Sequence, residues 1–496
     1  MQKKQTILVV ASLLVVVLSV TLAYFTAQII GKGKNVTINS ADLKIIFTDS
    51  DGSISGTNIE PGKWNVTKTF TIENKSNETY KYNIVIQDLV NTFVTNGYLQ
   101  YKITSTNGGY NMTEFKDVPK SETATDTILA YSVSISVGVT QSYTVEFKYA
   151  NDESVDQSND MGKKLSGTLF ITEGTEDPNK TLYNQLLVDK STKLTRTDFS
   201  KVLTDNNTNT LYTGVEDSKT VYYFAGNATD NWVKFGKNAS NQDLYWRIIR
   251  TNSDGSVRLL YHGTSTTTTD AYIGTSAFNS SYDNIAYVSY MYGSLGSISS
   301  ARENTNNSTI KTTIDNWYIS NLEAKGYTKY LSTTAVYCND RSISSDSINF
   351  GAFTRLGTNK TPSYDCAATE DKFTVDTSTG NGKLTYPIAL MTADEVSFAG
   401  GLYGANTPTW YYYNSVNDSS TGSKFWWLLS PLDSSTSGSS MFIVRGSSNP
   451  GRLNYNYVNS NNGVRPALSL KSCVKYSSGD GSANEPYTIK ETETGC

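Results

Sequence analysis

The pattern of hydrophobic and polar positions divides the chain near residue 173. From residue 35 to residue 172, short runs that alternate apolar and polar residues, such as "LKIIFTDS", "KTFTIENKSN" and "SYTVEFKYA", are separated by turn-forming clusters. Alternation with a period of two places every second side chain on the same face of a strand. The pattern predicts an antiparallel β-sandwich over residues 35–172, followed by a polar, proline-containing linker at residues 173–180.

The region from residue 181 to residue 496 has a mixed pattern that predicts an α+β domain. The stretch "DLYWRIIRTNSDGSVRLLYHG", residues 243–263, predicts a hairpin that turns at Ser253, Asp254 and Gly255. The apolar positions of this hairpin that are available to a core are Trp246, Ile248 or Ile249, Val257 and Leu259.

Capping residues predict two helices in the same region. Ser308 is the expected N-cap of an amphipathic helix that ends at Gly326. Thr392 and Glu395 have the spacing of a capping box and predict a shorter helix that ends at Gly400. The second region therefore combines strands and short helices with long connections.

The N-terminus carries an export signal. Lys3 and Lys4 precede an apolar run from Ile7 to Phe25. This arrangement is typical of a secretory signal peptide, and the run is also about long enough to span a bilayer. Residues 1–34 are predicted to be a cleaved signal peptide or an uncleaved N-terminal signal anchor. We expect a protein outside the cell or at its surface that contacts the membrane only through this segment.

Composition and charge exclude one class of partner. The 496-residue chain is longer than one core usually supports, and it has a formal net charge of −4 and a pI near 5.4. Nucleic-acid binding needs a clustered basic face, which this balance does not indicate. The chain contains 34 Tyr and one His, a balance typical of extracellular β-rich modules. We expect two domains and no nucleic-acid partner.

The four cysteines are expected to form disulfides. Exported proteins with an even number of cysteines usually oxidise them, and the order along the chain favours Cys338 with Cys366 and Cys473 with Cys496. The other pairings remain open. No Cys-x-x-Cys spacing is present, and His262 is far away in sequence, so no metal site is predicted.

Several short motifs of the first region recur in one family of surface proteins. They are "TLAYFTA" at the end of the leader, "LKIIFTDS", "IEPGKW" at residues 59–64 and "VDQSNDMGKKLSGTLFIT". Through these motifs, residues 35–172 resemble the camelysin and TasA family of Gram-positive surface and biofilm-matrix proteins. The resemblance implies a jelly-roll sandwich that serves surface attachment or fibre assembly, in which an N-terminal strand completes the sheet of a neighbour.

Camelysin has been called a metalloprotease, but the sequence does not favour that activity here. Residues 35–172 contain no His and no Cys, so a zinc site would have to be built from carboxylates alone. The acidic stretch "NDESVDQSND" offers Asp152, Asp156 and Asp160 as calcium ligands, but without the spacing of a known calcium loop. We interpret this stretch as a solvated loop.

A second set of motifs lies toward the C-terminus. "KFWWLLSPLD", residues 424–433, is followed by an Asn- and Tyr-rich segment, and the sequence "GVRP", residues 463–466, then precedes an aliphatic run. In this order the motifs resemble the formylglycine-generating-enzyme branch of the C-type-lectin fold. "YCNDRS" and "GDGSANEPYTI" are similar to an uncharacterised extracellular domain of gut Firmicutes. The resemblance implies a C-type-lectin-like α+β domain over residues 181–496.

The chain departs from the enzymes of that branch, the sulfatase-modifying factors, at the reactive cysteines. The oxidase of the family uses a cysteine pair close before the final strand, whereas residues 426–465 contain no cysteine. The reaction cannot be carried over without a thiolate pair that binds copper. His262 is interpreted as structural, and Asp394 and Glu395 are explained by helix capping. We predict no catalytic residue, no enzyme activity and no cofactor.

The segment before Gly463 is a candidate ligand face. Asn454 and Asn456 alternate with Tyr455 and Tyr457, so that in an extended strand the amides point one way and the rings the other. Uncharged amides and phenols are the side chains on which paratopes rely. The residues expected to contact a glycan or a surface protein are Asn449, Arg452, Asn454, Tyr455, Asn456, Tyr457, Asn459, Asn461, Asn462, Trp410 and Trp427.

Further expectations concern the surroundings of this face. The run Trp410–Tyr413 is expected to add aromatic surface, and of Trp426 and Trp427 one is expected to be buried and the other near the surface. Arg465 is expected to donate hydrogen bonds to loop carbonyls. The alternative is a plain loop with good turn chemistry, in which half of each aromatic run lies in the core. An Asn-rich segment at this place also resembles the targets of diversity-generating retroelements.

These features favour an exported cell-surface protein of a Gram-positive bacterium that acts as an adhesin or another ligand-binding module. The alternative is a structural biofilm-matrix or fibre subunit that has no soluble ligand. An enzyme similar to the sulfatase-modifying factors comes third, because the matching cysteine pair is missing.

Overall fold

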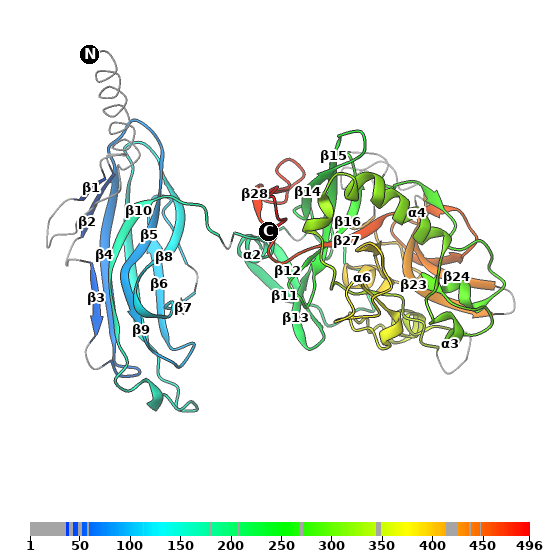
Figure 1. Ribbon diagram of the computed structural model, residues 1–496, viewed down its shortest axis with the longest axis horizontal. Helices are drawn as coiled ribbons and strands as arrows, with labels where there is room; N and C mark the ends of the chain where they lie inside the picture. The colour runs from blue at the N-terminus through cyan, green and yellow to red at the C-terminus, as the bar shows by residue number, and fades with distance from the viewer. Residues whose placement is uncertain are drawn as a thin grey trace, which may run out of the picture. The chain divides into compact units, whose positions relative to one another are not determined.

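The computed structural model divides the chain into two compact units, residues 1–178 and residues 179–496 (Figure 1). It describes residues 36–38, 43–47, 52–56 and 59–496, apart from gaps at 113, 179, 207, 268–270, 344–348, 413–423, 436–437 and 447. The predicted leader, residues 1–34, and Tyr413 lie outside the described residues.

The first unit consists of antiparallel strands in two sheets, as the period-two pattern predicts. In its described part, one sheet has the order β1-β2-β4-β9-β6-β7 and the other the order β3-β10-β5-β8. The strands are β1 Val36–Ile38, β2 Leu43–Phe47, β3 Ser53–Gly56, β4 Asn65–Asn74, β5 Tyr80–Asn91, β6 Leu99–Ser105, β7 Lys116–Asp117, β8 Ser121–Ile135, β9 Thr140–Tyr149 and β10 Leu165–Glu173. A 3₁₀ turn, η1, spans Ser158–Asp160.

Alternation along the strands builds the core of this unit. Every second residue of β9, including Tyr143, Val145 and Phe147, is buried. The same apolar cluster includes Ile84 from β5 and Leu169 from β10, so both sheets bury one face against each other. The prediction of a β-rich first unit is therefore confirmed.

The second unit is also mostly β-sheet, with few and short helices. Its larger sheet has the order β11-β12-β13-β15-β14-β29-β28, with β16 beside β15, β27 beside β16, and β22 beside β27. The strands of this sheet are β11 Thr192–Thr195, β12 Thr210–Glu216, β13 Lys219–Tyr223, β14 Trp232–Lys237, β15 Asp243–Thr251, β16 Val257–Gly263, β22 Ile388–Leu390, β27 Pro466–Leu470, β28 Tyr476–Ser478 and β29 Tyr487–Ile489.

A second sheet carries the candidate ligand segment, in the order β17-β26-β23-β24-β25. Its strands are β17 Thr275–Ser276, β23 Trp426–Ser435, β24 Gly438–Val444, β25 Leu453–Tyr457 and β26 Asn462–Gly463. Two small ladders complete the described strands of this unit: β18 Met291–Tyr292 with β19 Asn306–Asn307, and β20 Tyr337–Cys338 with β21 Lys372–Phe373.

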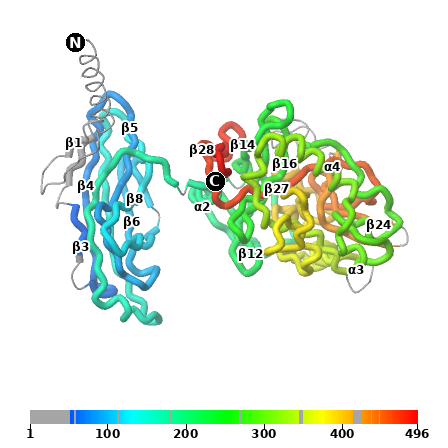
Figure 2. The backbone as a smooth tube through the Cα atoms, in the orientation of Figure 1, coloured from blue at the N-terminus to red at the C-terminus, as the bar shows by residue number. Residues whose placement is uncertain are grey.

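Short helices connect these sheets (Figure 2 traces the backbone). The α-helices are α2 Leu182–Asp189, α3 Ile298–Ala301, α4 Thr309–Tyr318, α5 Gly351–Phe353 and α6 Ala393–Phe398. The tighter or wider turns are η2 Ile285–Val288, η3 Ile319–Glu323, η4 Tyr327–Tyr330, η5 Thr354–Asn359 and η6 Thr369–Asp371. One large apolar cluster includes residues from both sheets and from α4 and α6.

The local predictions for this unit are confirmed. The hairpin forms between β15 and β16, and its predicted core positions are buried. The Ser308 hydroxyl caps α4 by accepting a hydrogen bond from the Lys311 amide, and Gly326, with φ +76°, follows the continuation of this helix through η3. Thr392 and Glu395 form the predicted capping box of α6. Both predicted disulfides, Cys338–Cys366 and Cys473–Cys496, are present.

Candidate ligand-binding face

Strand β25 lies at the end of the second sheet and presents two tyrosine rings to solvent. Among the described strands, β25 is a neighbour only of β24 in the sheet order. The Tyr455 and Tyr457 side chains are 41% and 45% exposed, whereas Leu453 on the same face is buried. The predicted alternation is therefore real, and the rings occupy the more exposed of its two faces.

A third tyrosine, Tyr282, lies beside Tyr457. The Tyr282 ring lies 5.8 Å from the ring of Tyr457, centroid to centroid, and is 41% exposed. Gly438, with φ +143°, lies beside both rings, and a Cβ atom at this position would approach a Tyr282 ring carbon to 2.6 Å and a Tyr457 ring carbon to 3.1 Å. The absence of a side chain at residue 438 therefore lets the two rings come together. We call Tyr282, Tyr455 and Tyr457 the tyrosine row.

The amides of the segment have several environments. Asn454 and Asn456 are half-buried, and Asn456 accepts a hydrogen bond from the Ser460 hydroxyl at 3.0 Å. Asn459 and Asn461 are exposed in the turn that follows β25. These two amides are thus the ones in the turn that a ligand can reach.

Two predicted contact residues that precede β25, Asn449 and Arg452, form hydrogen bonds with other side chains. The Arg452 guanidinium donates to the side-chain oxygen of Asn406 at 3.2 Å, and Arg445 donates to the side-chain oxygen of Asn449 at 3.2 Å. Arg452 and Asn449 are half-buried. Their hydrogen bonds fix the approach of the chain to β25, a role that spacing in the sequence does not reveal.

Three residues of the predicted ligand set are buried, which corrects the prediction. Trp410 is 2% exposed and donates its indole N–H to the Phe224 carbonyl, and Trp427 is fully buried and donates to the Ser276 carbonyl. Asn462 is buried within β26. Each indole finds an apolar pocket and a backbone acceptor far away in sequence, so that neither is available to a ligand.

The burial of neighbouring aromatic residues decides the other expectations for the two aromatic runs. Trp426 is also buried, so the expectation of one surface tryptophan in the pair with Trp427 is wrong. Tyr411 and Tyr412 are buried as well and add no aromatic surface. The expectation that Arg465 donates to loop carbonyls is confirmed for the Tyr411 carbonyl, at 2.6 Å. Its other acceptor, the Tyr261 carbonyl at 3.2 Å, lies in β16.

His262 is enclosed by the core. Its ring packs edge-on against Trp232, with 4.3 Å between the ring centroids. Burial, with added repulsion from Arg247 and Arg465, holds the pKa of His262 well below its usual range. A neutral, buried imidazole of this kind packs as a core residue and has no access to a substrate.

A buried ionic network, which the sequence did not predict, lies beneath the hairpin. Arg250 and Arg258 face each other across β15 and β16, and both donate to the same carboxylate oxygen of Glu395, at 2.9 and 2.8 Å. Arg250 also donates to Glu216 at 2.7 Å. Burial alone would raise the pKa of Glu395, but Arg258 and Arg250 hold it below its ordinary value.

A second ion-pair cluster adjoins this network. Arg355 donates two hydrogen bonds to Asp394, at 2.9 and 3.0 Å, and one to Asp340 at 2.6 Å. The cavity between the two clusters has a volume of about 20 Å³, is lined in part by Cys338 and has room for about one water molecule. Because the charges of the Arg355 cluster are paired and the space beside them is so small, we interpret these ion pairs as stabilising the fold.

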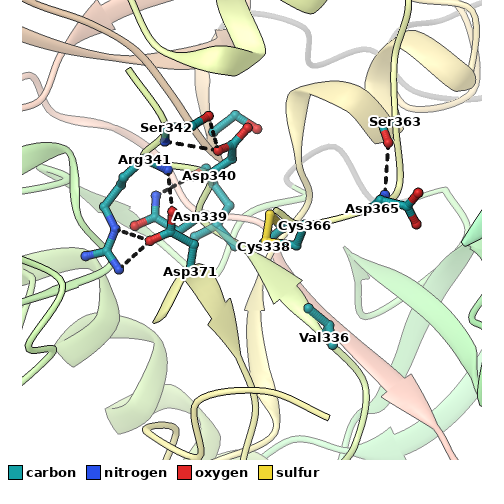
Figure 3. Close-up of a disulfide and its surroundings, with 12 residues drawn as sticks. Val336, Cys338, Asn339, Asp340, Arg341, Ser342, Ser363, Asp365, Cys366 and Asp371 are labelled. Carbon is teal, nitrogen blue, oxygen red and sulfur yellow. Dashed lines mark hydrogen bonds and ion pairs between the residues drawn. A yellow bond between two sulfur atoms is a disulfide. The ribbon is translucent and has the colours of Figure 1, made fainter. Parts of the chain in front are cut away.

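The disulfide beside this cavity is surrounded by further polar contacts (Figure 3). Arg341 donates to Asp371 through its backbone amide at 2.9 Å and through its side chain at 2.8 Å, and the Ser342 hydroxyl donates to Asp340. These bonds hold the segment that follows Cys338. The sequence contained one signal of the buried acid Glu395. Arg250 and Arg258 lie on the two strands of a predicted core hairpin, and a buried arginine needs an acidic partner.

The acidic loop of the first unit uses its carboxylates locally. Asp160 accepts hydrogen bonds from the backbone amides of Val94 and Thr95 and from the Tyr149 hydroxyl. Asp152 and Asp156 accept bonds from residues two positions further along the loop. Within the described residues, no three His, Cys, Asp or Glu side chains come together as a set of metal ligands.

Within the described part of the chain, no helix combines the length and the apolar character that a membrane span requires.

Comparisons with known proteins add no family. No protein-family model and no curated protein sequence matches the chain. Among solved structures, a β-glucosidase from Kluyveromyces marxianus in complex with glucose is aligned at 10% sequence identity with a TM-score of 0.15. The alignment covers 29% of this chain and 14% of the glucosidase chain, and a likeness at this level carries no argument about fold or activity.

Proposed function

We propose that this chain is an exported cell-surface protein of a Gram-positive bacterium whose second unit binds a glycan or a surface protein. The observation that carries the proposal is the tyrosine row, which places exposed phenol rings on a sheet held by a large core. Rigid aromatic side chains offer contact area at low cost in conformational entropy. The two disulfides and the apolar N-terminal run are features that suit an exported protein.

The finer fold assignments belong to this proposal. We assign the first unit to the jelly-roll type of camelysin and TasA, and the second to the C-type-lectin-like type, on the motifs described above. No catalytic residue and no cofactor are part of the proposal. The proposed contact residues are Tyr282, Tyr455, Tyr457, Asn459 and Asn461.

A structural matrix subunit is the second candidate. In the described part of the sandwich, β8 is a 15-residue strand at a sheet edge, and its half from Ser121 to Thr127 is largely exposed. An open edge of this length can pair with a strand of another copy. This candidate predicts that the mature chain assembles into fibres and binds no soluble ligand.

The test uses residues 35–496, produced under oxidising conditions and applied to a glycan array and to immobilised mucin. We expect saturable binding that falls at least tenfold in the double variant Tyr455→Ala and Tyr457→Ala. The matched control is Val215→Ala, an exposed side chain on β12 of the other sheet, which should bind like the parent. Fibre formation without binding by the folded parent would instead support the matrix subunit.

A further inference from the structure

The hydrogen-bond pattern of β25 determines which backbone groups face away from the sheet. The Arg445 amide donates to the Arg452 carbonyl, and the Val458 amide donates to the Ser439 carbonyl. Because bonded and non-bonded pairs alternate along an antiparallel ladder, residues 454 and 456 also point their backbone groups at β24. The groups that point to the open edge belong to Leu453, Tyr455 and Tyr457.

Local partners occupy the outward amides of the two tyrosines. The side-chain oxygen of Asn454 accepts the backbone N–H of Tyr455 at 2.8 Å, and that of Asn456 accepts the backbone N–H of Tyr457 at 3.0 Å. The alternating asparagines therefore fold back onto their own strand. Asn side chains commonly satisfy nearby backbone groups in this way and so compete with a β-ladder.

Two outward carbonyls are occupied as well. The Tyr457 carbonyl accepts the Ser460 amide at 2.9 Å, and the Leu453 carbonyl accepts the Gly404 amide at 3.0 Å. An incoming strand would need these donors and acceptors for its own ladder. To bond to the two tyrosine amides and to the Leu453 and Tyr457 carbonyls, it would first have to displace these local hydrogen bonds.

We propose that Asn454 and Asn456 close the edge of β25 to strand addition, and that the ligand of this face is a neutral saccharide held on the tyrosine row. This inference rests on the proposed function and names its ligand class. Phenol rings can stack on the C–H faces of a pyranose, while the hydroxyls of Tyr455 and Tyr457 and the exposed amides of Asn459 and Asn461 can exchange hydrogen bonds with sugar hydroxyls.

The lack of charge on β25 and on its following turn agrees with a neutral ligand. The exposed side chains of β25 and of its following turn carry no formal charge. Of the arginines that flank this segment, Arg445 and Arg452 are half-buried and donate to Asn449 and Asn406, and Arg465 is buried. The strand offers no exposed basic side chain that could pair with an acidic ligand.

The first test replaces Asn454 and Asn456 in a protein of residues 35–496. In the double variant Asn454→Val and Asn456→Val, the tyrosine amides are exposed on a strand of high β-propensity. Analytical ultracentrifugation should show concentration-dependent self-association beyond that of the parent. The control Asn459→Val with Asn461→Val should sediment like the parent. Asn454→Ala with Asn456→Ala, which also lacks a side-chain acceptor, serves if the valine variant fails to fold. Equal sedimentation of the folded variant and the parent would overturn the edge closure.

The second test compares ligand classes. The parent should bind neutral oligosaccharides, and Tyr455→Ala with Tyr457→Ala should weaken this binding at least tenfold while the protein remains as monomeric as the parent. Binding restricted to acidic glycans or to extended peptides would overturn the ligand class but would leave ligand binding by this unit in place. If the folded parent binds none of these, the proposed function fails as well, and the sedimentation result still decides the edge closure.

Discussion

At the scale of single residues, the second unit depends on charges that lie inside it. Glu395 serves three partners, because it accepts hydrogen bonds from Arg250, from Arg258 and from the backbone amide of Thr392. Burying ions costs free energy that only close pairing offsets. Removing the shared acceptor therefore leaves two guanidinium groups buried without their common counter-charge.

The substitution Glu395→Gln should lower the free energy of unfolding by about 3 to 5 kcal/mol, since it removes one partner of a buried ion pair. Urea denaturation followed by tryptophan fluorescence measures this loss. The exposed Glu485 provides the control, and Glu485→Gln should change the stability by less than about 0.5 kcal/mol. A similar small effect at residue 395 would contradict the role assigned to the network.

The same carboxylate predicts a dependence on pH. The arginines hold the pKa of Glu395 in the folded state below the ordinary value of 4.5. A depressed folded pKa adds stability above the unfolded pKa, and this stability is lost as the pH falls through the folded value. We expect the free energy of unfolding to drop as the pH falls below about 4.5. The drop should be smaller in Glu395→Gln, and equal slopes for variant and parent would contradict the assignment.

At the scale of elements, local chemistry made helices and hairpins predictable. The caps of α4 and α6 and the turn between β15 and β16 are decided within a few residues, and the structure has all three. The exposure of Tyr455 and Tyr457 follows from alternation along one strand. By contrast, the burial of Trp410 depends on the Phe224 carbonyl, 186 positions away, which no local pattern indicates.

The cap of α4 permits a quantitative test of this local chemistry. Ser308→Ala removes the acceptor of the Lys311 amide and also the hydrogen bond from the serine hydroxyl to the Tyr290 carbonyl. We expect a loss of about 1 to 2 kcal/mol in the free energy of unfolding. Ser320→Ala, at an exposed position further along the same helical segment, should cost less than about 0.5 kcal/mol. Equal effects of the two substitutions would show that the cap adds nothing.

At the scale of the whole molecule, the change in hydrophobic pattern near residue 173 indicated the boundary between two units, because each unit has its own apolar core. The two largest apolar clusters draw on different units, and the division at residues 178 and 179 falls in the polar segment 173–180. The rest of the domain organisation could not be read from the sequence. The larger sheet of the second unit pairs β14 with β29 and β16 with β27, which joins residues about 200 or more positions apart.

The uneven distribution of cysteines predicts how the two units respond to a reductant. Both disulfides lie in the second unit and close loops with sequence separations of 28 and 23 residues, each worth about 3 to 4 kcal/mol in the chain-entropy model. Calorimetry of residues 35–496 should show two transitions, of which dithiothreitol lowers only the one that belongs to the second unit. Limited proteolysis within residues 173–180 should release fragments that reproduce these transitions separately. The first unit is the internal control because it contains no cysteine. If dithiothreitol also lowered the transition of the first unit, or if the whole chain showed a single transition, the two cores would not fold independently.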